Sequence, residues 1–162
     1  MQKLKKKYIL IPIIAAILTP SLVIFILEIF VGHISPFKSM GNIIEKQFAS
    51  GHNLFLIMVF GLIPFVILTG ILAPIFRKIK GKRFDLIFWG GLIGILIPMI
   101  SGHVAVWYPL YSGGHASSTS VIAFFFIPFF CIITMGIGLL IGFLISLILF
   151  FKNQNKEKPL NY

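Results

Sequence analysis

The chain has 162 residues, of which 58% are hydrophobic and only 11% are charged, and its mean hydropathy is +1.03. Soluble globular domains are about 45–50% apolar and about 25% charged, so this composition excludes an ordinary soluble enzyme and a disordered chain. The presence of one cysteine excludes an internal disulfide framework. The length accommodates about four apolar helices of roughly 20 residues with short connections, so we expect residues 1–162 to form one membrane-integral domain.

Four apolar segments, at about residues 8–32, 53–76, 86–108 and 119–151, predict four transmembrane helices. A helix rises about 1.5 Å per residue, so each of the first three segments is long enough to cross a hydrocarbon core of about 30 Å with some tilt. The fourth segment is longer and must tilt, bend or project from the membrane. The short connections predict an all-α, antiparallel bundle of these four helices.

The net charge of +10 comes mainly from three basic blocks, at residues 3–7, 77–83 and 152–158, which hold twelve of the 14 lysines and arginines. Each block borders an apolar segment, and four spans place all three blocks on the same side of a membrane. Because cytoplasmic loops are enriched in lysine and arginine, this pattern predicts a cell-membrane protein with both termini in the cytoplasm. The blocks do not form one folded basic face, so nucleic acid is not an expected partner.

Four histidines, His33, His52, His103 and His115, each follow a glycine, and the topology above places all of them near the outer ends of the helices. Neutral imidazole is the commonest metal ligand in proteins, and histidines also ligate haem. Glu28, the one formal charge within the four apolar segments, is a further candidate ligand or proton acceptor. These residues define a candidate metal or haem b site. Histidine is also well accommodated at a bilayer boundary, so a boundary role without any ligand is the competing interpretation.

Hydroxyl side chains gather just before the fourth segment, at Ser117, Ser118 and Thr119. Such side chains accept hydrogen bonds from the first unpaired amides of a helix, and these amides also favour bound anions. The three residues therefore predict a helix cap or an anion site.

Small residues recur every fourth position in the third and fourth segments. Gly90 and Gly94 form one such row, and Gly138, Gly142 and Ser146 form the other. Small side chains allow membrane helices to approach closely, and both rows lie in the cytoplasmic half of their segments. We therefore expect the two rows to face each other.

The connection at residues 33–51 contains Ile43, Ile44 and Phe48, which share one face of a helix. This pattern is compatible with a helix on the membrane surface, a lid over the bundle or a partner-binding element, and the sequence leaves these alternatives open.

Together these features favour a small non-enzymatic membrane protein: a subunit, an accessory factor or an oligomeric transport element. Its expected surroundings are the lipid bilayer and either other membrane proteins or further copies of the chain. The alternative is a metal- or haem b-binding protein of the outer leaflet, with redox or hydrolase activity at the histidines.

Overall fold

The structure is a computed structural model that describes residues 5–48, 53–114 and 120–156. In these ranges it contains five helices and no strand: α1 (Lys7–Phe30), α2 (Pro36–Glu45), α3 (Leu54–Lys78), α4 (Lys82–Tyr111) and α5 (Ser120–Lys156). Four of them, α1, α3, α4 and α5 (the last from Ile122 to Lys152), are long and apolar enough to cross a membrane. The prediction of four such helices is therefore confirmed. α2 is an additional helix within the connection at residues 33–51.

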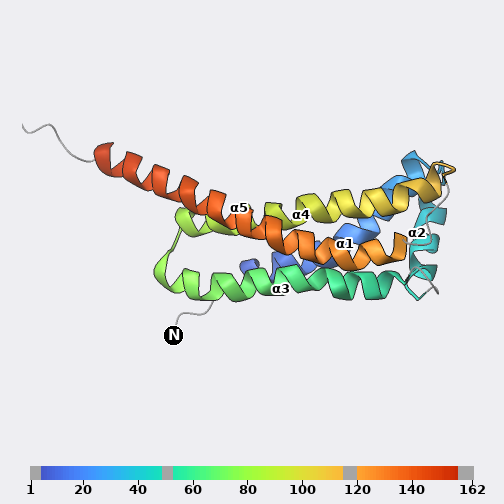
Figure 1. Ribbon diagram of the computed structural model, residues 1–162, viewed down its shortest axis with the longest axis horizontal. Coiled ribbons are helices and arrows are strands. Elements are labelled where there is room, and N and C mark those ends of the chain that lie inside the picture. Colours follow the sequence, from blue (N-terminus) through green and yellow to red (C-terminus); the bar gives the residue numbers. More distant parts are fainter. Residues whose placement is uncertain (1–4, 49–52, 115–119, 157–162) are drawn as a thin grey trace, which may run out of the picture.

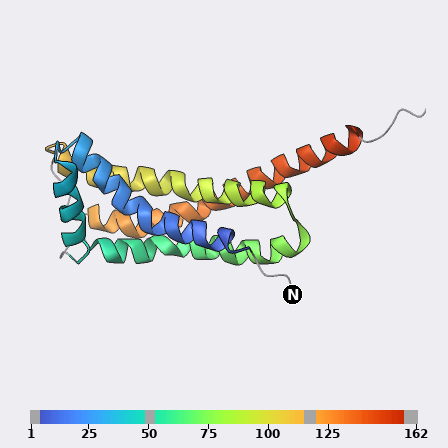
Figure 2. The same ribbon diagram turned by 180° about the vertical axis from the view of Figure 1, so that it is seen from behind.

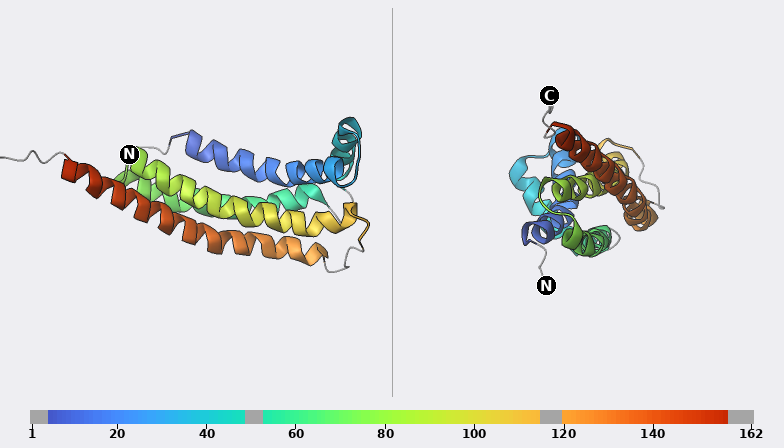
Figure 3. Two further views of the ribbon diagram at one scale, coloured as in Figure 1. Left: turned by 90° about the horizontal axis from the view of Figure 1, so that it is seen from above. Right: turned by 90° about the vertical axis from the view of Figure 1, so that its left-hand side faces the viewer.

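The four long helices lie along the long axis of the molecule, and α2 lies across one end of them (Figure 1). The view from behind shows the end of α1 and the start of α3 at this same end, which we call the α2 end (Figure 2). α5 projects beyond the other helices at the opposite end, as the side view in Figure 3 also shows. Its 37 residues explain this projection, because the other long helices have 24 to 30.

Large apolar side chains lie both between the helices and on their outer surface. Phe65, Leu68 and Ile95 are fully buried between helices. Phe129 and Ile133 of α5, in contrast, are more than 60% exposed. Exposed apolar surface on long helices is what a surrounding bilayer would cover, so the arrangement is that of a membrane protein.

α4 begins four residues earlier than the segment expected from the sequence, because a short turn separates it from α3. Gly81 has a φ of 65°, a left-handed conformation that glycine adopts at no steric cost. Asp85 then lies in the first turn of α4, where the positive end of the helix dipole favours a carboxylate.

Asp85 also joins α4 to the start of α1. The Tyr8 hydroxyl donates a hydrogen bond to its Oδ1 over 2.6 Å, and the Lys7 ammonium lies 3.0 Å from the same oxygen. The Tyr8 ring is buried and meets the Phe84 and Phe88 rings edge to face, with centroids 4.7 and 5.0 Å apart. This aromatic and polar contact fixes α1 against α4 at the end opposite α2.

α4 and α5 touch through their backbones where the two glycine rows lie. A Cβ atom built on Gly138 would lie 2.2 Å from the carbonyl oxygen of Gly90. A Cβ on Gly142 would lie 2.5 Å from the carbonyl oxygen of Leu86, and one on Gly94 would lie 2.4 Å from that of Thr134. Real Cβ atoms do not approach backbone so closely, so this helix contact requires glycine at these positions.

Thr134 extends the α5 row by one turn toward the α2 end. Its hydroxyl donates to the carbonyl oxygen of Gly94 across the helix contact, over 2.6 Å. At the other end of the row, Ser146 is buried and its hydroxyl donates to the carbonyl oxygen of Phe143 within α5, over 2.7 Å. The spacing of Thr134, four residues before Gly138, was the signal in the sequence for this additional member.

Gly138→Ala is expected to lower the free energy of unfolding by about 1–3 kcal/mol, the usual cost of overpacking, because the added methyl group collides with the Gly90 backbone. Gly136→Ala is the matched control, since a Cβ there meets nothing within 4 Å. The control should keep or raise stability, by at most about 1 kcal/mol, through its better helix propensity. Unfolding by denaturing detergent, followed by circular dichroism, measures both. Equal stability of the two variants would contradict a backbone contact at Gly138.

Candidate functional site at the α2 end

A buried carboxylate is the central feature of the α2 end. Glu28, in the last turns of α1, has 0% exposed surface. The ammonium group of Lys46 forms an ion pair with Glu28 Oε1. Lys46 is the residue at the C-terminal cap of α2. A buried charge is stable only when it is paired and hydrogen-bonded, so this contact is what permits an ionised glutamate here.

Two further side chains complete the hydrogen bonding of Glu28. The Asn42 amide donates to Oε2 over 3.3 Å, and the Tyr111 hydroxyl, at the end of α4, donates to Oε1 over 3.1 Å. The Lys46 ammonium also donates to the Tyr111 hydroxyl oxygen over 2.8 Å. We call Glu28, Asn42, Lys46 and Tyr111 the polar cluster. It joins α1, α2 and α4 at one point.

Aromatic rings surround the ammonium group of this cluster. Lys46 Nζ lies 5.2 Å from the centroid of the Tyr111 ring and 6.0 Å from that of the Trp107 ring. The faces of aromatic rings attract cations, most strongly where water is excluded. The rings therefore offset part of the cost of removing Lys46 from water.

The end of α1 is shaped so that Tyr111 can reach Glu28. A Cβ on Gly32 would lie 3.0 Å from the carbonyl oxygen of Glu28 and 3.4 Å from the Tyr111 ring. The next residue, His33, has a φ of 52°, and the amide of Ile34 donates to the Glu28 carbonyl over 2.9 Å. This is the left-handed termination common at helix ends, and histidine is among the residues that adopt it more readily than most.

Backbone hydrogen bonds hold α2 in place at its C-terminal end, and a proline favours its start. Pro36 occupies the first turn of α2, where its fixed φ favours a helix start. At the other end, the carbonyl oxygen of Lys46 accepts a hydrogen bond from the Leu54 amide over 3.0 Å, and that of Gln47 accepts one from Phe55 over 3.1 Å. The end of α2 is thus tied to the start of α3 as well as to α1 and α4.

α2 has two chemically opposite faces. The buried Ser39 lies on the same face as Asn42 and Lys46, and this face contacts the ends of the long helices. The opposite face carries Phe37, Met40, Ile44 and, just after the helix, Phe48, whose exposed fractions are 90%, 58%, 72% and 75%. We call these four residues the α2 apolar face. The segment at residues 33–51 thus contains a helix whose mainly polar side covers one end of the long helices. Ile43 packs there against the core, so the expectation that it shares a face with Ile44 and Phe48 is wrong.

The structure describes two of the four predicted histidine ligands, and their surroundings differ. His33 is exposed, and its left-handed backbone conformation lies just after the end of α1. His103 is 2% exposed within α4, and its Nδ1 lies 2.8 Å from the Met99 carbonyl oxygen, while Nε2 is buried with no hydrogen-bond partner among the described residues. The Glu28 oxygens are occupied by the polar cluster.

His52 and His115 lie outside the described residues, as do Ser117, Ser118 and Thr119. Within residues 5–48, 53–114 and 120–156, no group of three or more histidine, cysteine, aspartate or glutamate side chains is placed to hold a metal ion. A site shared by all four histidines therefore stays a prediction.

Sequence reasoning missed three members of the polar cluster, Asn42, Lys46 and Tyr111. One signal was present: Lys46 and Lys38 are the basic residues that lie outside the three basic blocks. An acidic residue within an apolar segment needs a partner, and a lysine in the adjoining loop is a candidate. The helical register of α2 then distinguishes the two lysines, because Lys38 is exposed and Lys46 points to Glu28.

Comparison of the chain with protein-family models, with curated proteins and with solved structures finds no match. The function must therefore be argued from the geometry of the chain itself.

Lys46→Met is expected to lower the free energy of unfolding by about 3–5 kcal/mol, because it leaves the Glu28 carboxylate buried without its cation. Adding Glu28→Gln to Lys46→Met should restore most of this loss, since a neutral amide is far less costly to bury than an unpaired charge. Thermal unfolding in detergent measures the effect.

Lys38→Met is the matched control, because it removes the same charge from an exposed position on the same helix. Its stability should stay within about 0.5 kcal/mol of the parent. If Lys46→Met is no more destabilising than Lys38→Met, the ion pair does not hold α2.

Proposed function

We propose that this chain is a non-enzymatic subunit or accessory factor of the cell membrane, with both termini in the cytoplasm, and that it binds a second membrane protein through the α2 apolar face. The observation that carries the proposal is the two-faced arrangement of α2, whose polar side is fastened to the bundle while its apolar side is left open.

The polar contacts keep the α2 apolar face turned away from the long helices, although Ile43, on the opposite side of α2, is partly buried against the core. Rolling the helix to bring Phe37 or Ile44 against the long helices would remove Lys46 from Glu28 and leave a buried charge unpaired. Exposed apolar side chains that lie together in one surface patch are typical of interaction sites. The polar cluster thus holds α2 in the position that a partner surface requires. Catalysis is less well supported, because the Glu28 carboxylate is already paired with Lys46.

The distribution of charge supports the proposed orientation. The start of α1, the connection from α3 to α4 and the last turns of α5 lie at the end opposite α2 (Figure 1). The described parts of all three basic blocks are therefore at that end. Because positive charge is retained on the cytoplasmic side, α2 is proposed to face the outside.

Single-cysteine labelling tests the orientation. In a Cys131→Ser background, a cysteine at Glu45 should react with a membrane-impermeant thiol reagent in intact cells, and a cysteine at Lys80 should react only after the membrane is permeabilised. Both positions are exposed. Ser39 is unsuitable because its side chain is buried. The opposite labelling pattern would reverse the proposed orientation.

Photocrosslinking in native membranes tests the α2 apolar face. A photoreactive amino acid in place of Phe37 or Ile44 should give the same protein adduct of defined mass, because both positions face the proposed partner. The same group at Lys38, exposed on another side of the helix, is the control and should give little of that adduct. Adducts with lipid alone at all three positions would show that α2 rests on the membrane surface and would refute a protein partner there.

A further inference from the structure

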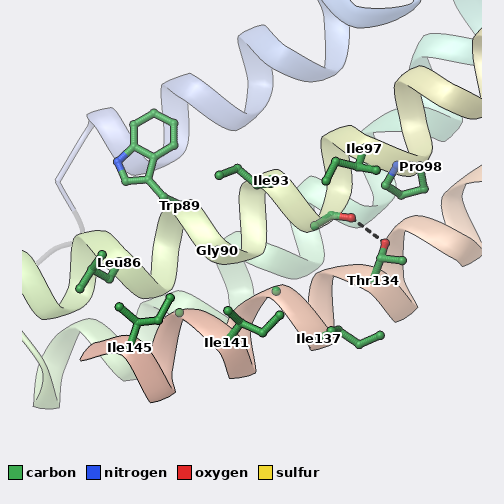
Figure 4. A pocket seen from close by; sticks show the side chains of 13 residues that line it. Leu86, Trp89, Gly90, Ile93, Ile97, Pro98, Thr134, Ile137, Ile141 and Ile145 are labelled. Atoms are coloured by element: carbon green, nitrogen blue, oxygen red, sulfur yellow. Dashed lines mark hydrogen bonds between the residues drawn. The ribbon is translucent and has the colours of Figure 1, made fainter. Parts of the chain in front are cut away.

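An apolar groove runs along the outer surface of the contact between α4 and α5 (Figure 4). It extends from Leu86 to Pro98 on α4 and from Thr134 to Ile145 on α5, with a cavity volume of about 430 Å³. Most of the isoleucines that flank it, among them Ile97 and Ile137, are more than half exposed. The groove therefore opens toward the surroundings of the helices rather than toward their core.

The glycine rows explain why a groove exists here. They bring the two backbones into contact at its floor, while the isoleucines rise on either side of it (Figure 4). The one hydroxyl that lines the groove, that of Thr134, is already donated to the Gly94 carbonyl. The lining thus offers contacts to a flexible apolar chain and no unsatisfied polar group along its length.

The length of the groove matches one leaflet of a bilayer. Pro98 lies twelve residues after Leu86, which corresponds to about 18 Å of helix at about 1.5 Å per residue. Half of a hydrocarbon core of about 30 Å is about 15 Å. A single acyl chain that enters at one surface would therefore lie along the whole groove.

Two basic residues follow the groove lining along the helices at the end opposite α2. Arg83 lies seven residues before Gly90, and Lys152 lies seven residues after Ile145, so each continues the helix face that lines the groove. The Arg83 guanidinium carbon lies 4.5 Å from the centroid of the Phe150 ring of α5. Its Nε is buried and has no hydrogen-bond partner among the described residues.

We propose that this groove binds an anionic glycerophospholipid of the leaflet at the basic end, with one acyl chain along the isoleucines and the phosphate against Arg83 and Lys152. Arginine binds phosphate through two parallel hydrogen bonds, and basic pockets between membrane helices are known sites for anionic lipid headgroups. Trp89, half-exposed toward the same end of the groove, belongs to the residue type that is enriched at the level of lipid headgroups. The charge at this end favours an anionic lipid over a zwitterionic one with the same chains.

Native mass spectrometry of the full chain in detergent tests this site, with phosphatidylglycerol and phosphatidylcholine of identical acyl chains as the two probes. Phosphatidylglycerol should be retained about tenfold more strongly, as expected for the gain or loss of one charge-assisted hydrogen bond. Arg83→Gln and Lys152→Gln should each remove most of this preference. Lys38→Gln, which removes one positive charge at the α2 end, is the matched control and should preserve it.

A second variant pair tests the acyl chain without changing any charge. Ile141→Trp places a bulky ring in the groove and should weaken retention of both lipids. Leu140→Trp, at a neighbouring exposed position that does not line the groove, should not. Thermal unfolding in detergent without added lipid shows whether each variant is folded.

Equal retention of the two lipids by the parent chain would overturn the proposal. So would an equal effect of Arg83→Gln and Lys38→Gln, or binding that Ile141→Trp leaves unchanged. Because α2 lies at the other end of the bundle, loss of this lipid site would leave the proposed partner surface on α2 unaffected.

Discussion

The need to neutralise one buried carboxylate determines how the α2 end is built. Glu28 lies at the end of an apolar helix with no exposed surface, where an unpaired charge would cost several kcal/mol. Lys46, Asn42 and Tyr111 satisfy it from two other helices. The helix α2 is therefore held by its polar side, and the connection between α1 and α3 becomes a fixed cap rather than a loose loop. The ion pair of Glu28 and Lys46 stabilises the position of α2 chiefly because separating the two charges would leave Glu28 buried and unpaired.

The orientation of α2 follows from that pairing and reverses the usual arrangement of an amphipathic helix. In a soluble protein the apolar face turns inward, but here the inward face carries Asn42 and Lys46, while Phe37 and Ile44 point away from the bundle. A surface of this kind is stable in a membrane interface or against a partner, and unfavourable in water. The chemistry of one glutamate thus decides which side chains the cap presents.

The contact between α4 and α5, in contrast, is organised by shape rather than by charge. The glycines of α4 and α5 remove the side chains that would keep the two backbones apart, and carbonyl oxygens lie where Cβ atoms would otherwise be. Close packing is the main force between helices in lipid, where no hydrophobic effect draws them together. The same contact leaves a groove between the flanking isoleucines, with Arg83 and Lys152 on the faces that continue it. The glycine rows therefore account both for the close packing of α4 against α5 and for the candidate lipid site.

The sequence alone determined the four long apolar helices, because the cost of burying backbone and charge in lipid depends on local composition over about 20 residues. It also pointed to Glu28 and the glycine rows, since both are unusual residues at particular positions in a helix. The tertiary structure decided the partners: Tyr111 is 83 residues from Glu28, and Lys46 is 18 residues away across a change of direction. Composition and periodicity describe one helix at a time, whereas the pairing of a buried charge depends on which helices meet at the same end of the bundle.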